Sequence, residues 1–126
     1  MCRRRKKKHK IPYCFLNTKY FDELGYQEID RIYDKFIELF TKKRVQEFDK
    51  HDLVKVAYLI GDRFSLQADA EHEKEDRQYY YKKMQHVSEL GLNLLKKHEG
   101  LLWNLGVALF FMEKYEQALN QFKSLL

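Results

Sequence analysis

The sequence of 126 residues is long enough for one domain with its own core, and its single proline and five glycines favour an all-α fold. Its net charge of +5 comes from the N-terminus, since residues 11–126 carry 17 basic and 19 acidic side chains, which argues against a body that binds nucleic acid. No apolar run reaches the ~20 residues of a membrane span, no secretory signal follows the basic start, and two cysteines make no disulfide framework, so we expect a cytoplasmic protein.

Residues 1–10 form a basic tail that we expect to be disordered, because like charges repel one another and nothing there can be buried. Its run of consecutive basic residues consists of Arg3, Arg4, Arg5, Lys6, Lys7 and Lys8. Three interpretations stay open: a localisation signal, a weak electrostatic contact with RNA or an anionic surface, and an inert solubilising end. The second would make the chain an RNA- or ribosome-associated factor, which is the alternative to the function inferred below.

The pattern predicts a helical domain over residues 11–126, beginning with a pair of helices over residues 11–24 and 26–43. Pro12 suits the first turn of the first helix, and Gly25 ends it. Apolar residues of the second helix recur at steps of three and four and so share one face. They are Tyr26, Ile29, Tyr33, Phe36, Ile37 and Phe40.

A second pair is predicted over residues 53–70 and 77–97, after a linker in which Asp49 or Asp52 can cap the helix. The charged stretch 71–76 should lengthen the turn between them. The second of these helices is expected to direct a stripe of mainly apolar residues inward. They are Tyr80, Met84, Val87, Gly91, Leu94 and Leu95.

The last pair occupies residues 101–126, with a tight turn near Glu113 and Lys114. Residues 102–111 are apolar around the whole circumference, which predicts a helix buried on several sides. The following helix is amphipathic. Gly106 and Ala118 are small enough to let the two helices approach closely.

The third pair resembles the tetratricopeptide repeat (TPR), a helix–turn–helix unit of about 34 residues. The residues at the family's offsets are Leu105, Gly106, Leu109, Tyr115, Ala118, Phe122 and Leu125. Ile60 and Gly61 repeat the Leu105–Gly106 pair, whereas Asn17 replaces the glycine in the first pair, and Leu102 stands where the family has tryptophan. The resemblance implies an α-α superhelix of three antiparallel helix pairs. The irregular middle pair is also similar to the regulator-of-microtubule-dynamics branch, and no specific member is indicated.

No residue set points to an enzyme, a cofactor or a metal site. Cys2, Cys14 and the histidines lack the spacing of zinc ligands, and no serine or cysteine has a neighbouring base and orienting group. His72 lies among acidic residues that could bind a metal weakly, but a solvated charged helix turn is the preferred interpretation. A glycine-rich phosphate loop is also missing from the sequence.

The resemblance implies that the first helix of each pair lines a concave face, which in such arrays binds partners. The residues carried over to the partner-binding positions are Phe21, Tyr58, Asp62, Trp103, Val107 and Phe110, with Cys14, Thr18 and Ser65 beside them. This set predicts a mostly apolar and aromatic groove for a helix or an extended peptide. Only Asn104 approaches the carboxylate-clamp pattern, so we do not expect a clamp. The groove could instead be covered by the chain's own tail, a partner subunit or further C-terminal sequence.

The sequence ends at Leu126 without the polar capping helix that repeat arrays carry. Two expectations follow: the chain is a truncated piece of a longer repeat protein, or its C-terminal helix face forms a homodimer. We favour the first.

Overall fold

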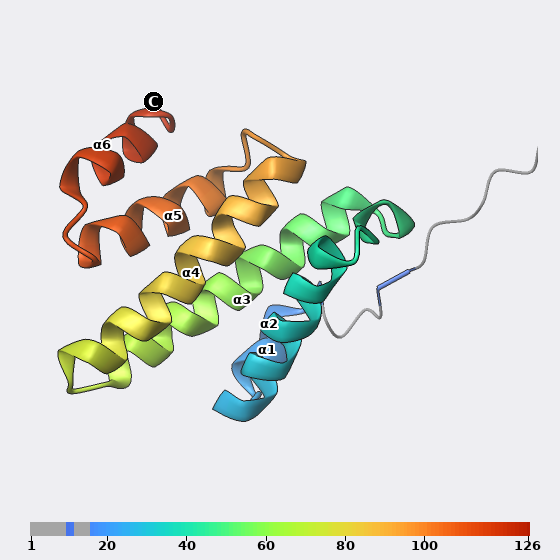
Figure 1. Cartoon of the computed structure of the whole chain (residues 1–126), viewed down its shortest axis with the longest axis horizontal. Helices are drawn as coiled ribbons and strands as arrows, with labels where there is room; N and C mark the ends of the chain where they lie inside the picture. Colours follow the sequence, from blue (N-terminus) through green and yellow to red (C-terminus); the bar gives the residue numbers. More distant parts are fainter. Residues whose placement is uncertain (1–9, 12–15) are drawn as a thin grey trace, which may run out of the picture.

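The computed structural model describes residues 10–11 and 16–126, and the described part contains helices and no strand, which confirms the all-α prediction (Figure 1). Its helices are α1 (Thr18–Asp22), α2 (Tyr26–Thr41), a 3₁₀ turn η2 (Val45–Glu47), α3 (Lys50–Ala70), α4 (Lys74–Leu94), α5 (Glu99–Phe111) and α6 (Tyr115–Lys123). The predicted basic run Arg3–Lys8 and Cys14 lie outside the described residues. None of the described helices is both long and apolar enough to span a bilayer.

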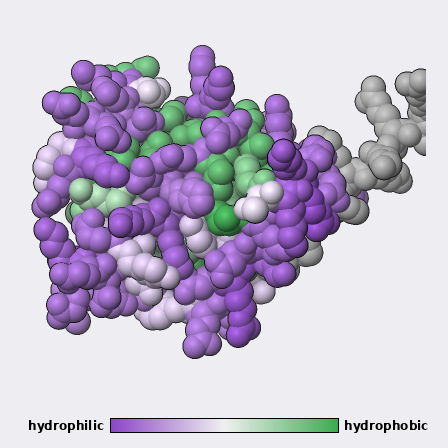
Figure 2. Space-filling model, in the orientation of Figure 1, coloured by the Kyte–Doolittle hydropathy of each residue, from purple (hydrophilic) through white to green (hydrophobic). Residues whose placement is uncertain are grey.

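Helix α3 is the centre of the arrangement. It pairs along its length with α4 and also contacts α1, α2 and α5. Helix α4 in turn packs against α5, and α5 against α6, so the hairpins follow one another across the molecule (Figure 1). The face seen in Figure 2 is mostly hydrophilic, with hydrophobic side chains gathered over its middle.

The N-terminal caps set where α1 and α3 begin. The Asn17 side chain accepts a hydrogen bond from the Lys19 backbone at 2.9 Å, so α1 starts at Thr18 and has five residues. In its described part, the helix predicted over residues 11–24 is therefore shorter than expected, and its predicted start at Pro12 lies outside the described residues. Asp49 is the cap of α3, because its carboxylate accepts from the backbones of His51 and Asp52.

Helix α4 begins at Lys74, earlier than the predicted residue 77. Glu75 and Asp76 lie in its first turn, where the positive end of the helix dipole stabilises carboxylates. The charged stretch 71–76 is therefore partly helix rather than a lengthened turn.

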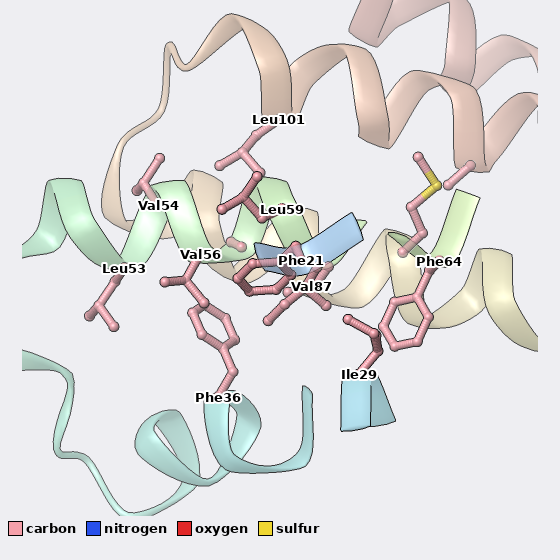
Figure 3. Packing of buried hydrophobic residues seen from close by; sticks show 14 of the residues in the cluster. Phe21, Ile29, Phe36, Leu53, Val54, Val56, Leu59, Phe64, Val87 and Leu101 are labelled. Atoms are coloured by element: carbon pink, nitrogen blue, oxygen red, sulfur yellow. The ribbon is translucent and has the colours of Figure 1, made fainter. Parts of the chain in front are cut away.

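One main core joins the first five helices (Figure 3). Helix α2 points Ile29 and Phe36 toward α3, which contributes Leu53, Val56, Leu59 and Phe64 on the other side. The core also contains Phe21 from α1, Val87 from α4 and Leu101 from α5. A smaller cluster of Leu105, Leu109 and Ala118 holds α6 on α5.

Lys83 of α4 links α2 to this core through an ion pair and cation–π contacts. Its Nζ lies 3.0 Å from the Asp30 carboxylate and 5.1, 5.6 and 4.5 Å from the ring centroids of Tyr33, Phe64 and Tyr79. Burial lowers the pKa of this ammonium, but hydrogen bonds with Tyr79 and Asp30 raise it by more, so the net pKa lies above its usual value. The cation is therefore held by an ion pair and by aromatic faces together.

Gly61 and Gly106 are both buried at helix crossings, as expected from the sequence. A Cβ at Gly106 would lie 2.5 Å from the Phe122 ring, and one at Gly61 would lie 3.0 Å from Nδ2 of Asn104. A larger residue at either position would force the Phe122 ring or the Asn104 amide to move from its place between the helices.

Candidate binding surface

Tyr58, Asp62 and Ser65 follow one another at helical spacing on α3 and so share one face. The half-buried Tyr58 ring rests on Gly100, where a Cβ would lie 2.6 Å from it, and its centroid is 5.9 Å from the His98 ring. The connection between α4 and α5 thus fixes where this ring lies.

Asn104 of α5 is the polar link between α3 and α5. It is 2% exposed, and its Nδ2 donates to the Tyr58 carbonyl oxygen at 3.4 Å. The space for this amide exists because Gly61 lies opposite it. The carboxylate of Asp62 also interacts with Asn104 and with the Tyr58 side chain. A buried amide so satisfied fixes the register of α5 on α3.

Asp62 is a half-buried carboxylate, and burial raises its pKa above the usual range of aspartate. Hydrogen bonds from Asn104 and Tyr58 oppose this rise in the pKa, whereas the negative charge of Asp22 adds to it. The pKa of Tyr58 is raised as well, first by the charge of Asp62 and then by burial. Hydrogen bonds therefore hold the Asp62 carboxylate in place, but no positive charge in the described part of the chain neutralises it.

Trp103, Val107 and Phe110 lie along the solvent side of α5. Trp103 is 56% exposed and Phe110 is 48% exposed, although Val107 is half-buried against the main core. The Trp103 ring lies 5.2 Å from Phe122, and the Phe110 ring lies 5.4 Å from Tyr115, so side chains of α6 support both rings. The result is a fixed aromatic surface that water reaches.

We call the surface formed by Tyr58, Asp62, Trp103, Val107 and Phe110 the α1–α3–α5 face. The expected role of Phe21 in it needs correction. Phe21 is 1% exposed, because the short helix α1 presses this ring into the core, and so it forms a wall of the hollow described below rather than an exposed aromatic contact. Tyr115 and Leu119 are exposed on α6, the helix expected to form a homodimer, and Leu126 beyond its end is exposed as well.

A hollow of about 220 Å³ opens between α1 and α3. The predicted groove residues Thr18, Phe21, Asp62 and Ser65 all line it, and so do Asp22, Leu59, Arg63 and Leu66. The walls of this hollow are mainly apolar, as the sequence predicted, but two of the three charged side chains among them are the carboxylates Asp22 and Asp62. The face therefore has an acidic end at α1 and α3 and an aromatic end on α5.

The sequence did not predict the larger hollow of about 430 Å³ between α2, η2 and α3. Its apolar walls include Ile32, Phe36, Leu39, Phe48, Leu53 and Val56, and its rim carries Arg31, Lys35, Lys42 and Arg44. Ile11 also lines this hollow, and the residues that follow it in the chain lie outside the described range.

Within residues 10–11 and 16–126, no three histidine, cysteine or carboxylate side chains gather as a metal site would require. No family model matches the sequence, and comparisons with curated proteins and with solved structures find no match either.

His98 predicts a pH dependence of stability. Its Nδ1 accepts a hydrogen bond from the Leu101 backbone at 3.1 Å, which caps α5, and burial lowers its pKa. Because its folded pKa lies below the unfolded value, its contribution is present above about pH 6.5 and lost as the pH falls through the folded value. Between about pH 7.5 and pH 5, we expect the wild type to lose more stability than a His98→Asn variant, which keeps a cap that does not titrate. Urea unfolding at both pH values measures this, and equal losses in the two proteins would contradict it.

Proposed function

We propose that the chain is a non-enzymatic protein–protein interaction scaffold of TPR-like architecture, which holds a peptide or helix of its partner against the α1–α3–α5 face. The order of helix contacts supports the architecture. Helix α3 touches α5, and α4 packs on both α3 and α5, as expected when the antiparallel hairpins α3–α4 and α5–α6 stack with their first helices on one side. Helices α1 and α2 each contact α3 but do not pair with each other along their lengths, which departs from the repeat. The close crossings at Gly61 and Gly106 agree with this arrangement.

The observation that carries the proposal is the exposure of two large aromatic side chains on a fixed helix. Trp103 and Phe110 are supported by α6 from behind and half open to water in front. Burying such rings against a partner contributes more binding free energy than burying most other side chains does. Tryptophan and tyrosine are accordingly enriched among known binding hot spots. Because their helix is already packed, little conformational entropy is lost when a ligand docks.

The chain offers a direct readout, since Trp103 is its single tryptophan. We would select binders from a displayed library of random short peptides and titrate them while recording tryptophan emission. We expect a blue shift on binding, because the exposed indole moves out of water. Phe110→Ala should weaken binding about tenfold or more. Trp103→Ala should weaken it by a similar factor, and its binding is measured by calorimetry because the fluorescent residue is gone.

Tyr26→Ala is the matched control, because Tyr26 is as exposed as Trp103 but lies on α2. It should leave the affinity unchanged. Peptides that bind with no change in Trp103 emission, or that tolerate both α5 substitutions, would contradict the proposal. Circular dichroism and melting curves establish that each variant is folded.

A further inference from the structure

The α1–α3–α5 face contains a carboxylate whose charge the protein does not neutralise. Asp62 receives hydrogen bonds from Tyr58 and Asn104, which are both uncharged donors. Among the ion pairs found within the described part of the chain, none involves Asp62. A half-buried carboxylate without a cation keeps a strong attraction for one.

The cations nearest in the chain are directed elsewhere. Arg63 lines the same hollow, but its Nη2 donates to the Leu24 carbonyl oxygen at 2.8 Å. Lys55, on the same side of α3, lies two turns before Asp62, which is about 10 Å along the helix axis. The other charged group near Asp62 is the carboxylate of Asp22, which also lines the hollow and repels it.

The hollow and the aromatic surface lie on adjacent helices. Asn104 contacts the Tyr58 carbonyl of α3, and its sequence neighbour Trp103 begins the aromatic end of the face on α5. The hollow of about 220 Å³ is large enough for the end of a lysine or arginine side chain. Packed helices lie about 8–10 Å apart, so a ligand of a few extended residues is long enough to span from the hollow to the aromatic end.

We propose, on the basis of the function proposed above, that the bound segment carries a lysine or arginine whose cationic group enters the hollow between α1 and α3 and pairs with Asp62. In the same segment a bulky apolar side chain packs on Trp103 and Phe110. Charge complementarity selects the cation, and burial of the aromatic rings supplies much of the affinity. The partner is thus a peptide segment that combines basic and apolar residues, not an acidic one.

Asp62→Asn separates this charge effect from folding. Asparagine keeps the shape of the side chain and an oxygen that accepts from Tyr58 and Asn104. Because burial and Asp22 raise the pKa of Asp62, its charged form is disfavoured in the folded state, so its removal should not lower the melting temperature. Asp34→Asn is the control, since Asp34 is an exposed carboxylate on α2.

The experiment combines substitutions on both molecules. Peptides selected from the random library on the wild type should be enriched in lysine or arginine at a fixed distance from an aromatic or aliphatic residue. A selected peptide should bind Asp62→Asn about ten- to a hundredfold more weakly, and Asp34→Asn unchanged. Replacing its basic residue by norleucine should weaken binding to the wild type by a similar factor, but have little effect on binding to Asp62→Asn.

The outcomes separate the two proposals. If peptides bind through Phe110 but show no basic residue, or if the norleucine substitution has the same effect on both proteins, the pairing with Asp62 is wrong and the scaffold function stands. If no peptide shifts the emission of Trp103, both are wrong. If Asp62→Asn has a lower melting temperature than the wild type, the affinity of the norleucine peptide for the wild-type protein still shows whether the ligand's cation is required.

Discussion

Replacing Phe64 by alanine is expected to lower the free energy of unfolding by about 3–5 kcal/mol. Phe64 is fully buried on α3, with its ring 5.3 Å from Tyr33 of α2 and 6.1 Å from Tyr80 of α4. It also forms one of the aromatic faces around Lys83. The substitution removes apolar contacts and leaves a cavity that these rings, fixed by their own helices, fill only in part.

Leu66→Ala on the same helix is the matched comparison. Leu66 is 53% exposed, so its truncation should change stability by no more than about 0.5 kcal/mol. Urea unfolding followed by circular dichroism measures both variants at equal protein concentration. If Phe64→Ala lost no more stability than Leu66→Ala, the joining of α2, α3 and α4 at this ring would be contradicted.

Periodicity predicted the helices well where tertiary contacts reinforce it. The apolar residues of α2 recur at steps of three and four, and Ile29 and Phe36 of that stripe are buried in the structure. The helix that is apolar all round, α5, is enclosed by α3, α4 and α6, which leaves Trp103 and Phe110 on its open side. Close helix crossings could be inferred from Gly61 and Gly106, because at both positions a side chain of the neighbouring helix occupies the space that a Cβ would need.

Local electrostatics and caps explain where the helix boundaries were missed. The Asn17 side chain caps α1 so that it begins at Thr18, inside the predicted helix, whereas the start expected at Pro12 lies outside the described residues. Glu75 and Asp76 stabilise the first turn of α4 where a loop was expected. The tyrosine run shows the same limit. Tyr80 packs against the main core as expected, but Tyr81 is buried more fully, because its ring stacks on Phe111 of α5 at 5.1 Å, a contact that the pattern of α4 alone does not reveal.

The sequence could predict which residues form the candidate site, but not which neighbouring groups surround them. Helical spacing places Tyr58, Asp62 and Trp103 on first helices, yet the charge of Asp62 depends on Asn104 and Asp22, which come from two other helices. Asn104 could have been noticed as the one amide in an apolar helix. Phe21 was misjudged because the repeat pattern gives a side chain's direction only while the helix keeps its expected length, and α1 has five residues.

A reciprocal pair of substitutions tests how α3, α4 and α5 meet. Leu101 of α5 is fully buried, and a Cβ at Gly91 of α4 would lie 2.5 Å from its Cδ1 and 3.1 Å from Cβ of Ala57 on α3. Leu101→Ala should therefore cost about 2–5 kcal/mol through the cavity it leaves, and Gly91→Ala about 1–3 kcal/mol through overpacking.

In the double variant the new methyl group at Gly91 fills space that Leu101 has vacated. Alanine also favours the helical state over glycine by about 1 kcal/mol, so Gly91→Ala should be neutral or stabilising in the Leu101→Ala background. The double-mutant cycle, measured by urea unfolding, should then give a favourable coupling of about 1–3 kcal/mol. Gly25→Ala provides the control, because nothing lies within 4 Å of its Cβ position, and its effect should add to that of Leu101→Ala. Additive effects at Gly91 as well would mean that α4 and α5 do not cross at this glycine.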